Sequence, residues 1–182
     1  MKWVVFFSQT GSEIVDISNK IKKVPDLIVT NNFETKINYH PGLRQLGAPI
    51  MADTHDKIMQ YFAENNDFEP YDTLITLHGY LRIVHASVCD KYTMFNGHPG
   101  AIDLYPELKG KDPQVRAYSA KYPKVGSIIH RVTPGVDEGE IVVSKTVKNT
   151  AGSMDEMFGI LKETSLKSWI SFFKEKQYEI WL

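Results

Sequence analysis

The sequence lacks most features of secreted, metal-binding and nucleic-acid-binding proteins. Its single cysteine, Cys89, cannot form a disulfide within the chain, and no Cys-x-x-Cys or His-x-x-x-His spacing indicates a zinc site. The 21 basic residues are matched by 22 acidic ones, so there is no positive excess that would attract nucleic acid. No apolar run is long enough to cross a membrane, and the opening "MKWVVFF" is shorter than a signal peptide requires. We therefore expect a cytoplasmic protein that binds neither nucleic acid nor membrane, with a reduced, buried thiol at Cys89.

The composition that is present can form a sizeable core. Of the 182 residues, 42% are apolar and 24% are charged, which is the balance of a globular protein. A chain of this length buries roughly two thirds of the surface that its unfolded form exposes. No repeat, low-complexity tract or linker divides it, so we expect one domain over residues 1–182, present as a monomer or homodimer.

Short apolar runs alternate with stretches of helical periodicity along the chain. The run from Trp3 to Phe7 predicts a strand buried on both faces, and apolar residues at helical spacing follow it. Strand, loop and helix then recur, which is typical of an α/β fold with an open, mostly parallel, twisted sheet and helices on both faces. Further strands are expected at Leu27–Thr30, Thr73–Leu77, Thr93–Phe95, Gly126–Arg131 and Glu140–Val147, and further helices at Asp53–Asn65, within 78–92 and after Ser153. Residues 33–52 are expected to be mostly loop, and "YEIWL" at 178–182 a small strand.

Candidate chemistry collects where the expected strands end. Ligands of open α/β sheets bind outside the carboxyl ends of the strands. Four polar stretches fall there: "SQTGSE", "LHGYLR", "NGHPG" and "VTPGVDEG". Asn96 and His98 lie two residues apart just beyond an expected strand, so an extended backbone would point both side chains to the same side. An amide and an imidazole can together stabilise an oxyanion, and Asp137 in a separate loop can hold the imidazolium or relay a proton.

Two other interpretations of these residues stay open. The stretch "NGHPG" is also a plain turn that happens to hold a histidine. A metal hydrolase built from His78, His85 and His98 is the other, although the spacing of these histidines does not support it.

Three short motifs, taken together, resemble the folate-dependent formyltransferase family over nearly the full length of the chain. The family's Asn-x-His-Pro is matched at Asn96–Pro99, and its Val-Asp-x-Gly at Val136–Gly139. Its Gly-Tyr/Phe-x-Arg-Ile is matched at Gly79–Ile83. The order and spacing of the motifs are similar to those of the family, and "VTPGVDEG" looks most like the branch that acts on glycinamide ribonucleotide.

The resemblance implies a Rossmann-like formyltransferase fold and transfer of a formyl group from 10-formyltetrahydrofolate to a primary amine of a small acceptor, best matched by glycinamide ribonucleotide. It implies that Asn96 and His98 are catalytic hydrogen-bond donors, that Asp137 supports His98 and a proton-carrying water, and that no metal takes part. By the same resemblance the folate site is lined by Tyr80, Leu81, Arg82, Ile83, Val84, Thr133 and Val136.

The acceptor motif is matched only in part. The glycinamide ribonucleotide branch has Gly-Ser-Asn at a helix start, where backbone amides hold the substrate phosphate. Gly11 and Ser12 match this motif, but Glu13 replaces the amide residue. A carboxylate in a first helical turn suits the helix dipole when it points to solvent, whereas an inward carboxylate repels a phosphate.

Departures of this kind keep alternatives open. The stretch "GKDP" at Gly110–Pro113 and Glu13 favour N-formylation of an amino sugar nucleotide or another small amine. A non-catalytic folate- or nucleotide-binding module is a further alternative, although such a module has no need for the Asn, His and Asp set. A dinucleotide-binding module is disfavoured because "SQTGSE" lacks the three-glycine fingerprint.

Overall fold

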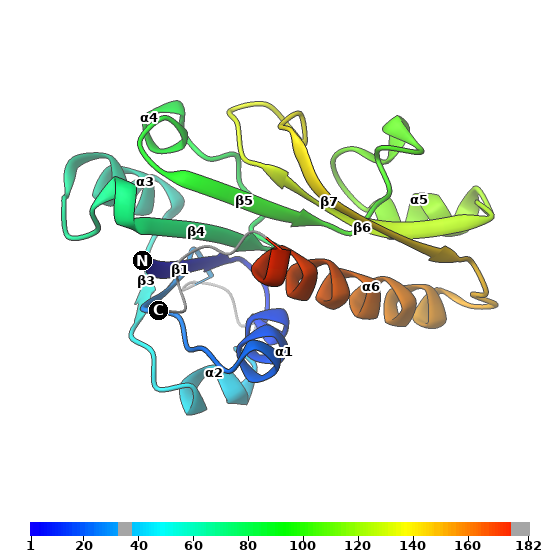
Figure 1. The fold of residues 1–182 in the computed structure, drawn as a ribbon, viewed down its shortest axis with the longest axis horizontal. Helices are drawn as coiled ribbons and strands as arrows, with labels where there is room; N and C mark the ends of the chain where they lie inside the picture. Colours follow the sequence, from blue (N-terminus) through cyan, green and yellow to red (C-terminus); the bar gives the residue numbers. More distant parts are fainter. Residues whose placement is uncertain (33–37, 176–182) are drawn as a thin grey trace.

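The computed structural model of the protein describes residues 1–32 and 38–175, and the strands of this part form one twisted sheet (Figure 1). The strand order is β3-β2-β1-β4-β5-β6-β7. The first five strands in this order pair in parallel, whereas β6 runs antiparallel to β5, and β7 antiparallel to β6. The strands are β1 Lys2–Phe7, β2 Leu27–Thr30, β3 Ile50–Ala52, β4 Thr73–His78, β5 Thr93–His98, β6 Lys124–Arg131 and β7 Ile141–Lys148. The prediction of an open, mostly parallel sheet is therefore confirmed.

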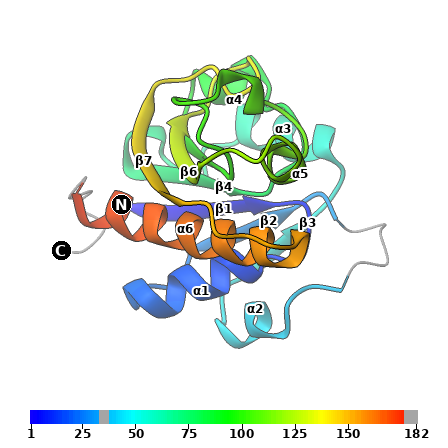
Figure 2. The ribbon, with the colours of Figure 1, turned by 90° about the vertical axis from the view of Figure 1, so that its right-hand side faces the viewer.

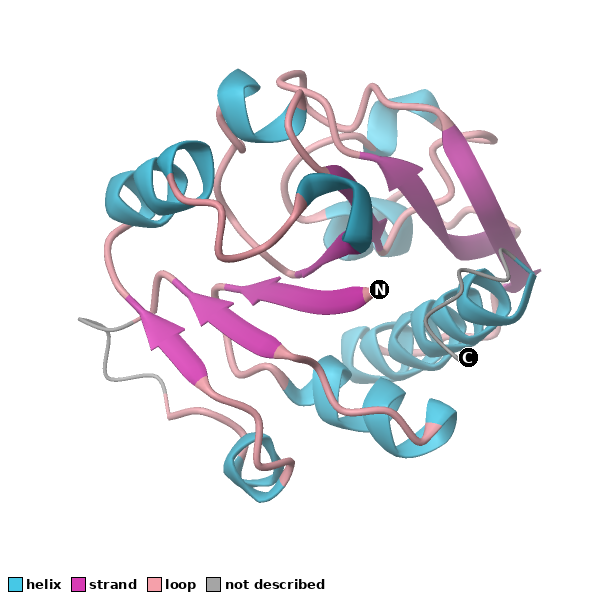
Figure 3. Ribbon diagram, turned by 60° about the vertical axis from the view of Figure 1, so that its left-hand side comes forward, coloured by secondary structure: helices cyan, strands magenta, loops and turns pink. Residues whose placement is uncertain are grey.

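Helices cover both faces of the sheet (Figures 2 and 3). They are α1 Ser12–Ile21, α2 Pro41–Gln45, α3 His55–Glu64, α4 Ala86–Cys89, α5 Pro113–Ser119 and α6 Met154–Glu175, with short 3-10 helices at Pro70–Asp72 and Pro106–Leu108. Helices α1, α2 and α6 lie on one face, and α3 and α4 lie on the other. Within the described residues, each helix is too short or too polar to span a bilayer.

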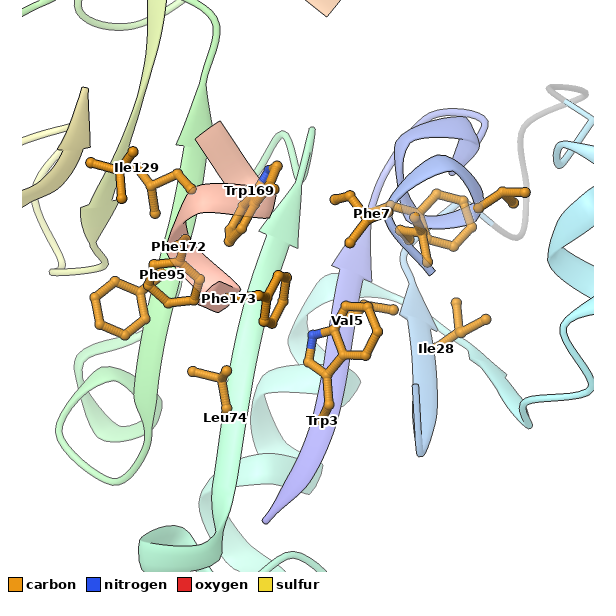
Figure 4. Close-up of a cluster of buried hydrophobic side chains, with 14 of the residues drawn as sticks. Trp3, Val5, Phe7, Ile28, Leu74, Phe95, Ile129, Trp169, Phe172 and Phe173 are labelled. Carbon is orange, nitrogen blue, oxygen red and sulfur yellow. The ribbon is translucent and has the colours of Figure 1, made fainter. Parts of the chain in front are cut away.

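Strand β1 shows why the sheet needs a helical layer on each side. Successive side chains of a strand point to opposite faces, and every residue from Trp3 to Phe7 is fully buried. Trp3, Val5 and Phe7 pack with Trp169 and Phe172 of α6 (Figure 4), while Val4 and Phe6 pack against α3. Helix α6 thus completes the core on the face that also carries α1.

Most predicted elements are found within a few residues of their expected bounds. Helix α6 begins after Ser153, whose Oγ accepts a hydrogen bond from the Glu156 backbone N–H (3.2 Å). The Glu156 carboxylate in turn accepts from the backbone N–H of Gly152 (2.6 Å). This reciprocal cap resembles a capping box but reaches one residue further, because the carboxylate bonds to the residue before Ser153, and it fixes the helix start expected after Ser153.

Three segments differ from the predictions. Residues 38–52 were expected to be mostly loop, but they contain α2, which is capped by the His40 ring accepting from Gly42 N (3.1 Å), and β3, which pairs with β2. Helix α5 was not predicted, because its seven residues are too few to show a helical period. Strand β5 extends to His98, because residues 95–98 pair with β6. The strand predicted at 178–182 lies outside the described residues.

Candidate active site

Asn96 and His98 both belong to β5, so the expectation that they lie just beyond a strand is wrong. Antiparallel pairing with β6 continues through them, with Asn96 opposite His130 and His98 opposite Ile128. Because side chains alternate along a strand, the two side chains share one face. The strand therefore fixes them more firmly than a turn would, and the interpretation of "NGHPG" as a plain turn is not supported.

His98 is buried, and both of its ring nitrogens contact protein groups. Its Nε2 lies 2.9 Å from the carbonyl of Leu108, and its Nδ1 lies 3.2 Å from Asp137 Oδ2. A carbonyl only accepts hydrogen bonds, so Nε2 carries a proton. Burial lowers the pKa of His98, and the neighbouring Asp137 carboxylate and the Leu108 carbonyl oppose that shift. A hydrogen bond from Nε2 to a substrate requires this nitrogen to exchange the Leu108 carbonyl for the substrate.

Asp137 connects His98 to a second histidine that the sequence analysis did not single out. Asp137 Oδ1 lies 3.2 Å from His130 Nε2, and that nitrogen lies 3.1 Å from Asn96 Nδ2. His130 Nδ1 faces the Arg131 carbonyl at 2.9 Å and so carries a proton. The structure therefore brings the three predicted catalytic residues into one cluster, with His130 as the link between Asn96 and Asp137.

The backbone of Asp137 is held in an uncommon conformation. Its φ is 51°, in the left-handed region, where Asp is tolerated better than most residues. Its Oδ2 also accepts a hydrogen bond from Gly110 N (2.8 Å). Burial raises the pKa of Asp137, but the hydrogen bond with His130, the charge of protonated His98 and the Gly110 N–H outweigh it and hold the pKa below the ordinary value. Asp137 is therefore a carboxylate at neutral pH.

Asp137 faces a ring nitrogen of each histidine, namely His98 Nδ1 and His130 Nε2. The His98 ring already carries a proton on Nε2, so a proton that it gains on Nδ1 lies between the ring and the Asp137 carboxylate. The cluster can accept, hold and return one proton, which is the requirement for acid–base chemistry.

Arg116 of α5 positions the segment that contacts this cluster. Its guanidinium donates to the backbone carbonyls of Glu107, Leu108, Lys109 and Lys111. The same segment places the Leu108 carbonyl on His98 and the Gly110 N–H on Asp137. The stretch around "GKDP" is therefore part of the site, and Arg116 is a second residue that the sequence analysis did not identify.

Two glycines of the motifs are required by close approaches. A Cβ atom on Gly139 would lie 1.8 Å from the backbone oxygen of Arg131, where the loop returns to β7. A Cβ atom on Gly97 would lie 2.7 Å from Trp169 Nε1, so the indole packs directly on the strand between Asn96 and His98. These contacts give a physical reason for glycine at both motif positions.

The residues predicted to bind folate differ in exposure. Leu81 and Ile83 are 65% and 57% exposed, and Val136 is 46% exposed, so their apolar side chains are accessible to a ligand. Arg82 is exposed, Thr133 is half-buried and Val84 is buried. The ring of Tyr80 packs on Phe6 in the core, so it cannot stack on a pterin, and only its backbone can line such a site.

Gly11, Ser12 and Glu13 form the start of α1. Gly11 is buried with a φ of 72° and precedes the first helical residue, as a left-handed turn into a helix requires. The Glu13 side chain is turned into the protein, where both of its carboxylate oxygens contact other side chains. Its Oε2 lies 2.9 Å from His78 Nδ1, and its Oε1 accepts from Ser165 Oγ (2.5 Å).

A chain of hydrogen bonds through β4 ends on the Glu13 carboxylate. Trp3 Nε1 donates to Thr76 Oγ1 (2.8 Å), and that oxygen lies 2.8 Å from His78 Nε2. Burial raises the pKa of Glu13, but the hydrogen bonds and charge of His78 and the Ser165 hydroxyl outweigh it and leave the pKa below the ordinary value. Glu13 is thus an ionised residue that joins α1 to β4 and α6. His78 links Thr76 to Glu13, which is a structural role.

The lowered pKa of Glu13 predicts a pH-dependent contribution to stability. A carboxylate with a depressed pKa in the folded state stabilises the fold above the ordinary glutamate pKa and loses this contribution as the pH falls through the lowered value. We expect Glu13→Gln to reduce the free energy of unfolding at pH 7 by about 1–3 kcal/mol, and the difference from wild type to shrink toward acid pH. Urea unfolding from pH 3 to 8 measures it, with exposed Glu64→Gln as control; a pH-independent difference would contradict the role of the charge.

The three histidines of the alternative metal-hydrolase interpretation do not come together. In the part of the chain that the structure describes, His78, His85 and His98 do not gather into a group that could hold a metal ion. His78 is bonded to Thr76 and Glu13, and His98 to Asp137 and Leu108. His85 lies instead beside His55 and Asp56.

The fold and site together define a class: an open α/β protein with a partly buried Asn, His and Asp cluster between β5 and the β6–β7 loop. A family model described as formyl transferase matches residues 51–159, a range that includes Asn96, His98 and Asp137 but not Gly11–Glu13. The chain belongs to the formyl transferase family. No curated protein sequence matches it.

Solved structures with the same fold include three bacterial enzymes. The phosphoribosylglycinamide formyltransferase of Streptococcus pneumoniae TIGR4 superposes with a TM-score of 0.79 at 21% identity, covering 96% of this chain and 97% of its own. The enzyme of Brucella melitensis gives 0.77 at 18% identity, covering 100% and 97%. That of Campylobacter jejuni subsp. jejuni NCTC 11168 gives 0.76 at 21%, covering 95% and 97%. At these identities the likeness establishes the fold.

Proposed function

We propose that the protein transfers a formyl group from 10-formyltetrahydrofolate to a primary amine of a small acceptor, and that Asn96, His98 and Asp137 are its catalytic residues. The observation that carries the proposal is the Asp137 carboxylate, which contacts His98 at 3.2 Å and reaches Asn96 through His130. The proposed enzyme is a single cytoplasmic domain that acts as a monomer or homodimer, and its reaction needs no metal.

The cluster meets the two requirements of formyl transfer to an amine. Negative charge develops on the formyl oxygen, and the amide of Asn96 is a neutral donor suited to stabilise it. His98 gives a second donor when its Nε2 leaves the Leu108 carbonyl. The attacking amine loses a proton, which the histidine and Asp137 cluster can hold and return to the leaving nitrogen.

The residues proposed for the folate fit a flat, partly apolar ligand. The folate supplies the formyl group. Leu81, Ile83 and Val136 present exposed apolar side chains, and burying them against a ring system removes apolar surface from water. Leu81 N is held by Ser8 Oγ (2.8 Å), which ties this segment to the loop before α1. Arg82, Val84, Thr133 and the backbone of Tyr80 complete the proposed folate site.

Glycinamide ribonucleotide is the acceptor that we propose first. Gly11 and Ser12 lie at the start of α1, where backbone N–H groups and the helix dipole favour a phosphate. The hydrogen bonds to His78 and Ser165 draw the Glu13 side chain into the protein and offset part of its charge. These contacts make a carboxylate at position 13 compatible with a phosphate on the backbone.

A second acceptor class is favoured by the same residue. Glu13 is ionised and lies in the first turn of α1, so its charge reduces the attraction of that helix end for a phosphate. An amine acceptor without a phosphate at this position, such as an amino sugar nucleotide or another small amine, avoids that repulsion.

A matched pair of acceptors distinguishes the two proposals. We would record the absorbance change as a 10-formyl folate analogue loses its formyl group, with glycinamide ribonucleotide, its dephosphorylated ribonucleoside, or an amino sugar nucleotide present. Our first proposal predicts turnover with glycinamide ribonucleotide and a kcat/KM at least tenfold lower for the ribonucleoside, because the phosphate contributes on the order of 1.4 kcal/mol or more of binding energy.

Each other outcome points to a different function. Equal rates with nucleotide and nucleoside would contradict a phosphate site at α1, and turnover with the amino sugar alone would support the second acceptor class. Binding of the folate without transfer to any amine would support the non-catalytic binding module. If the folate does not bind, the proposed function is wrong.

A further inference from the structure

A group of metal-ligating side chains lies on the face opposite α1 and α6. His55 and Asp56 are the first two residues of α3, and His85 immediately precedes α4. These two helices pack beside each other at one end of the sheet (Figure 1). One potential ligand atom from each of the three residues lies within 4.8 Å of the other two.

We propose that His55, Asp56 and His85 bind a divalent transition-metal ion. Two imidazoles and a carboxylate suit Zn²⁺ and its neighbours in the first transition row, whereas Mg²⁺ and Ca²⁺ prefer oxygen ligands alone. Bonds of about 2.0–2.2 Å place tetrahedral ligands about 3.4 Å apart. Separations of up to 4.8 Å therefore need to contract by up to about 1.4 Å, which rotation of the exposed Asp56 and His85 side chains allows.

One ligand of the proposed site is already held in place. His55 is partly buried, and its Nδ1 lies 2.9 Å from the hydroxyl of Tyr80, whose ring is fixed in the core. Ligating histidines commonly have a hydrogen-bond partner on the second ring nitrogen, which fixes the ring and its tautomer. Tyr80 has the position and chemistry of such a partner.

A purely local explanation accounts for two of the residues but not for the third. Asp56 suits the N-terminal turn of α3 through the helix dipole, and His55 is explained by its bond to Tyr80. His85 comes from a different segment, yet its exposed ring stands nearly perpendicular to the His55 ring, with centroids 5.1 Å apart. Two imidazoles and a carboxylate from separate segments then face one small volume that is open to solvent.

The proposed metal would act as a brace. His85 directly follows Val84, so an ion on these three ligands would fasten the segment 80–85 to α3. The fourth position would face solvent and take water, because Asp56 and His85 are both exposed. The site is separate from the Asn96, His98 and Asp137 cluster and does not depend on the proposed function.

Titration of chelator-treated protein with Zn²⁺ alone, followed by calorimetry, tests the site. We expect one Zn²⁺ per chain with micromolar or tighter affinity, and no heat with Mg²⁺. His85→Ala should weaken the binding by at least tenfold, and it should fold normally because the side chain is exposed. His98→Ala, which removes a histidine of the Asn96, His98 and Asp137 cluster, should leave the affinity unchanged.

The pattern across the variants decides the outcome. No binding to the wild-type protein, or equal affinity in His85→Ala and wild type, would overturn the proposal. Loss of binding in His98→Ala with retention in His85→Ala would also overturn it, by placing the ion at the catalytic cluster. The structure predicts that Zn²⁺ affinity falls in His85→Ala but not in His98→Ala. It also predicts a smaller fall in Tyr80→Phe.

Discussion

His98→Ala is expected to lower kcat for formyl transfer by about 10²- to 10⁴-fold, the usual contribution of a positioned acid–base group. The variant loses the ring that faces both Asp137 and the Leu108 carbonyl, so neither a proton nor a hydrogen bond to substrate can be handled there. Single-turnover rates at saturating folate and amine measure the chemical step. Circular dichroism and thermal unfolding report whether the fold is retained.

Two companion variants separate a catalytic loss from a structural one. Tyr71→Ala changes a side chain that is 84% exposed and should keep the wild-type rate. Asp137→Asn preserves the size of the side chain but removes the charge that stabilises a protonated histidine, so its rate should fall as well. Normal turnover by folded His98→Ala protein would refute the catalytic assignment.

Trp169→Ala is expected to reduce the free energy of unfolding by about 3–5 kcal/mol, the range for a large aromatic residue removed from a core. Trp169 is fully buried, and its ring contacts those of Phe172, Phe173 and His78. Figure 4 shows it beside the two phenylalanines of α6. It also packs on Gly97, between the two residues of β5 that we propose to be catalytic. For a chain of this size the loss corresponds to a decrease in Tm of about 6–20 °C.

Tyr71→Ala is the matched control for this prediction. Tyr71 is 84% exposed, so its removal should change the free energy of unfolding by less than about 0.5 kcal/mol. Trp169→Phe should lie between wild type and Trp169→Ala, because the smaller ring fills part of the cavity. A Tm for Trp169→Ala within two degrees of the control would mean that α6 contributes little to the core.

The fold was predictable because its central strands are buried on both faces. The run Trp3–Phe7 is wholly apolar, and Thr73–Leu77 is apolar apart from two buried threonines. The helices between them carry apolar residues at helical spacing. The edge of the sheet gave a weaker signal. Strand β3 has three residues and α2 has five, so neither is long enough to show a period.

The site was predictable where it follows one strand and unpredictable where it depends on register. Asn96 and His98 are two residues apart on β5, and their shared face follows from strand geometry. His130 reaches Asn96 only because β6 pairs antiparallel with β5, a register that no local pattern specifies. The orientation of Glu13 likewise depends on Ser165, which lies far along the chain. Arg116 bonds to backbone carbonyls five to nine residues earlier, and no side-chain pattern marks those groups.

The position of α6 in the chain also determines when the protein can finish folding during synthesis. Strands β1, β4 and β5 emerge from the ribosome long before Trp169, Phe172 and Phe173, which cover one face of those strands. Until residue 173 has emerged, Trp3, Val5 and Phe7 have no partner from α6, and Glu13 lacks the hydroxyl of Ser165. Helices α1 and α2 are made early and cover part of this face, but the part that α6 covers stays exposed for most of translation, and that interval is when the chain is most exposed to aggregation.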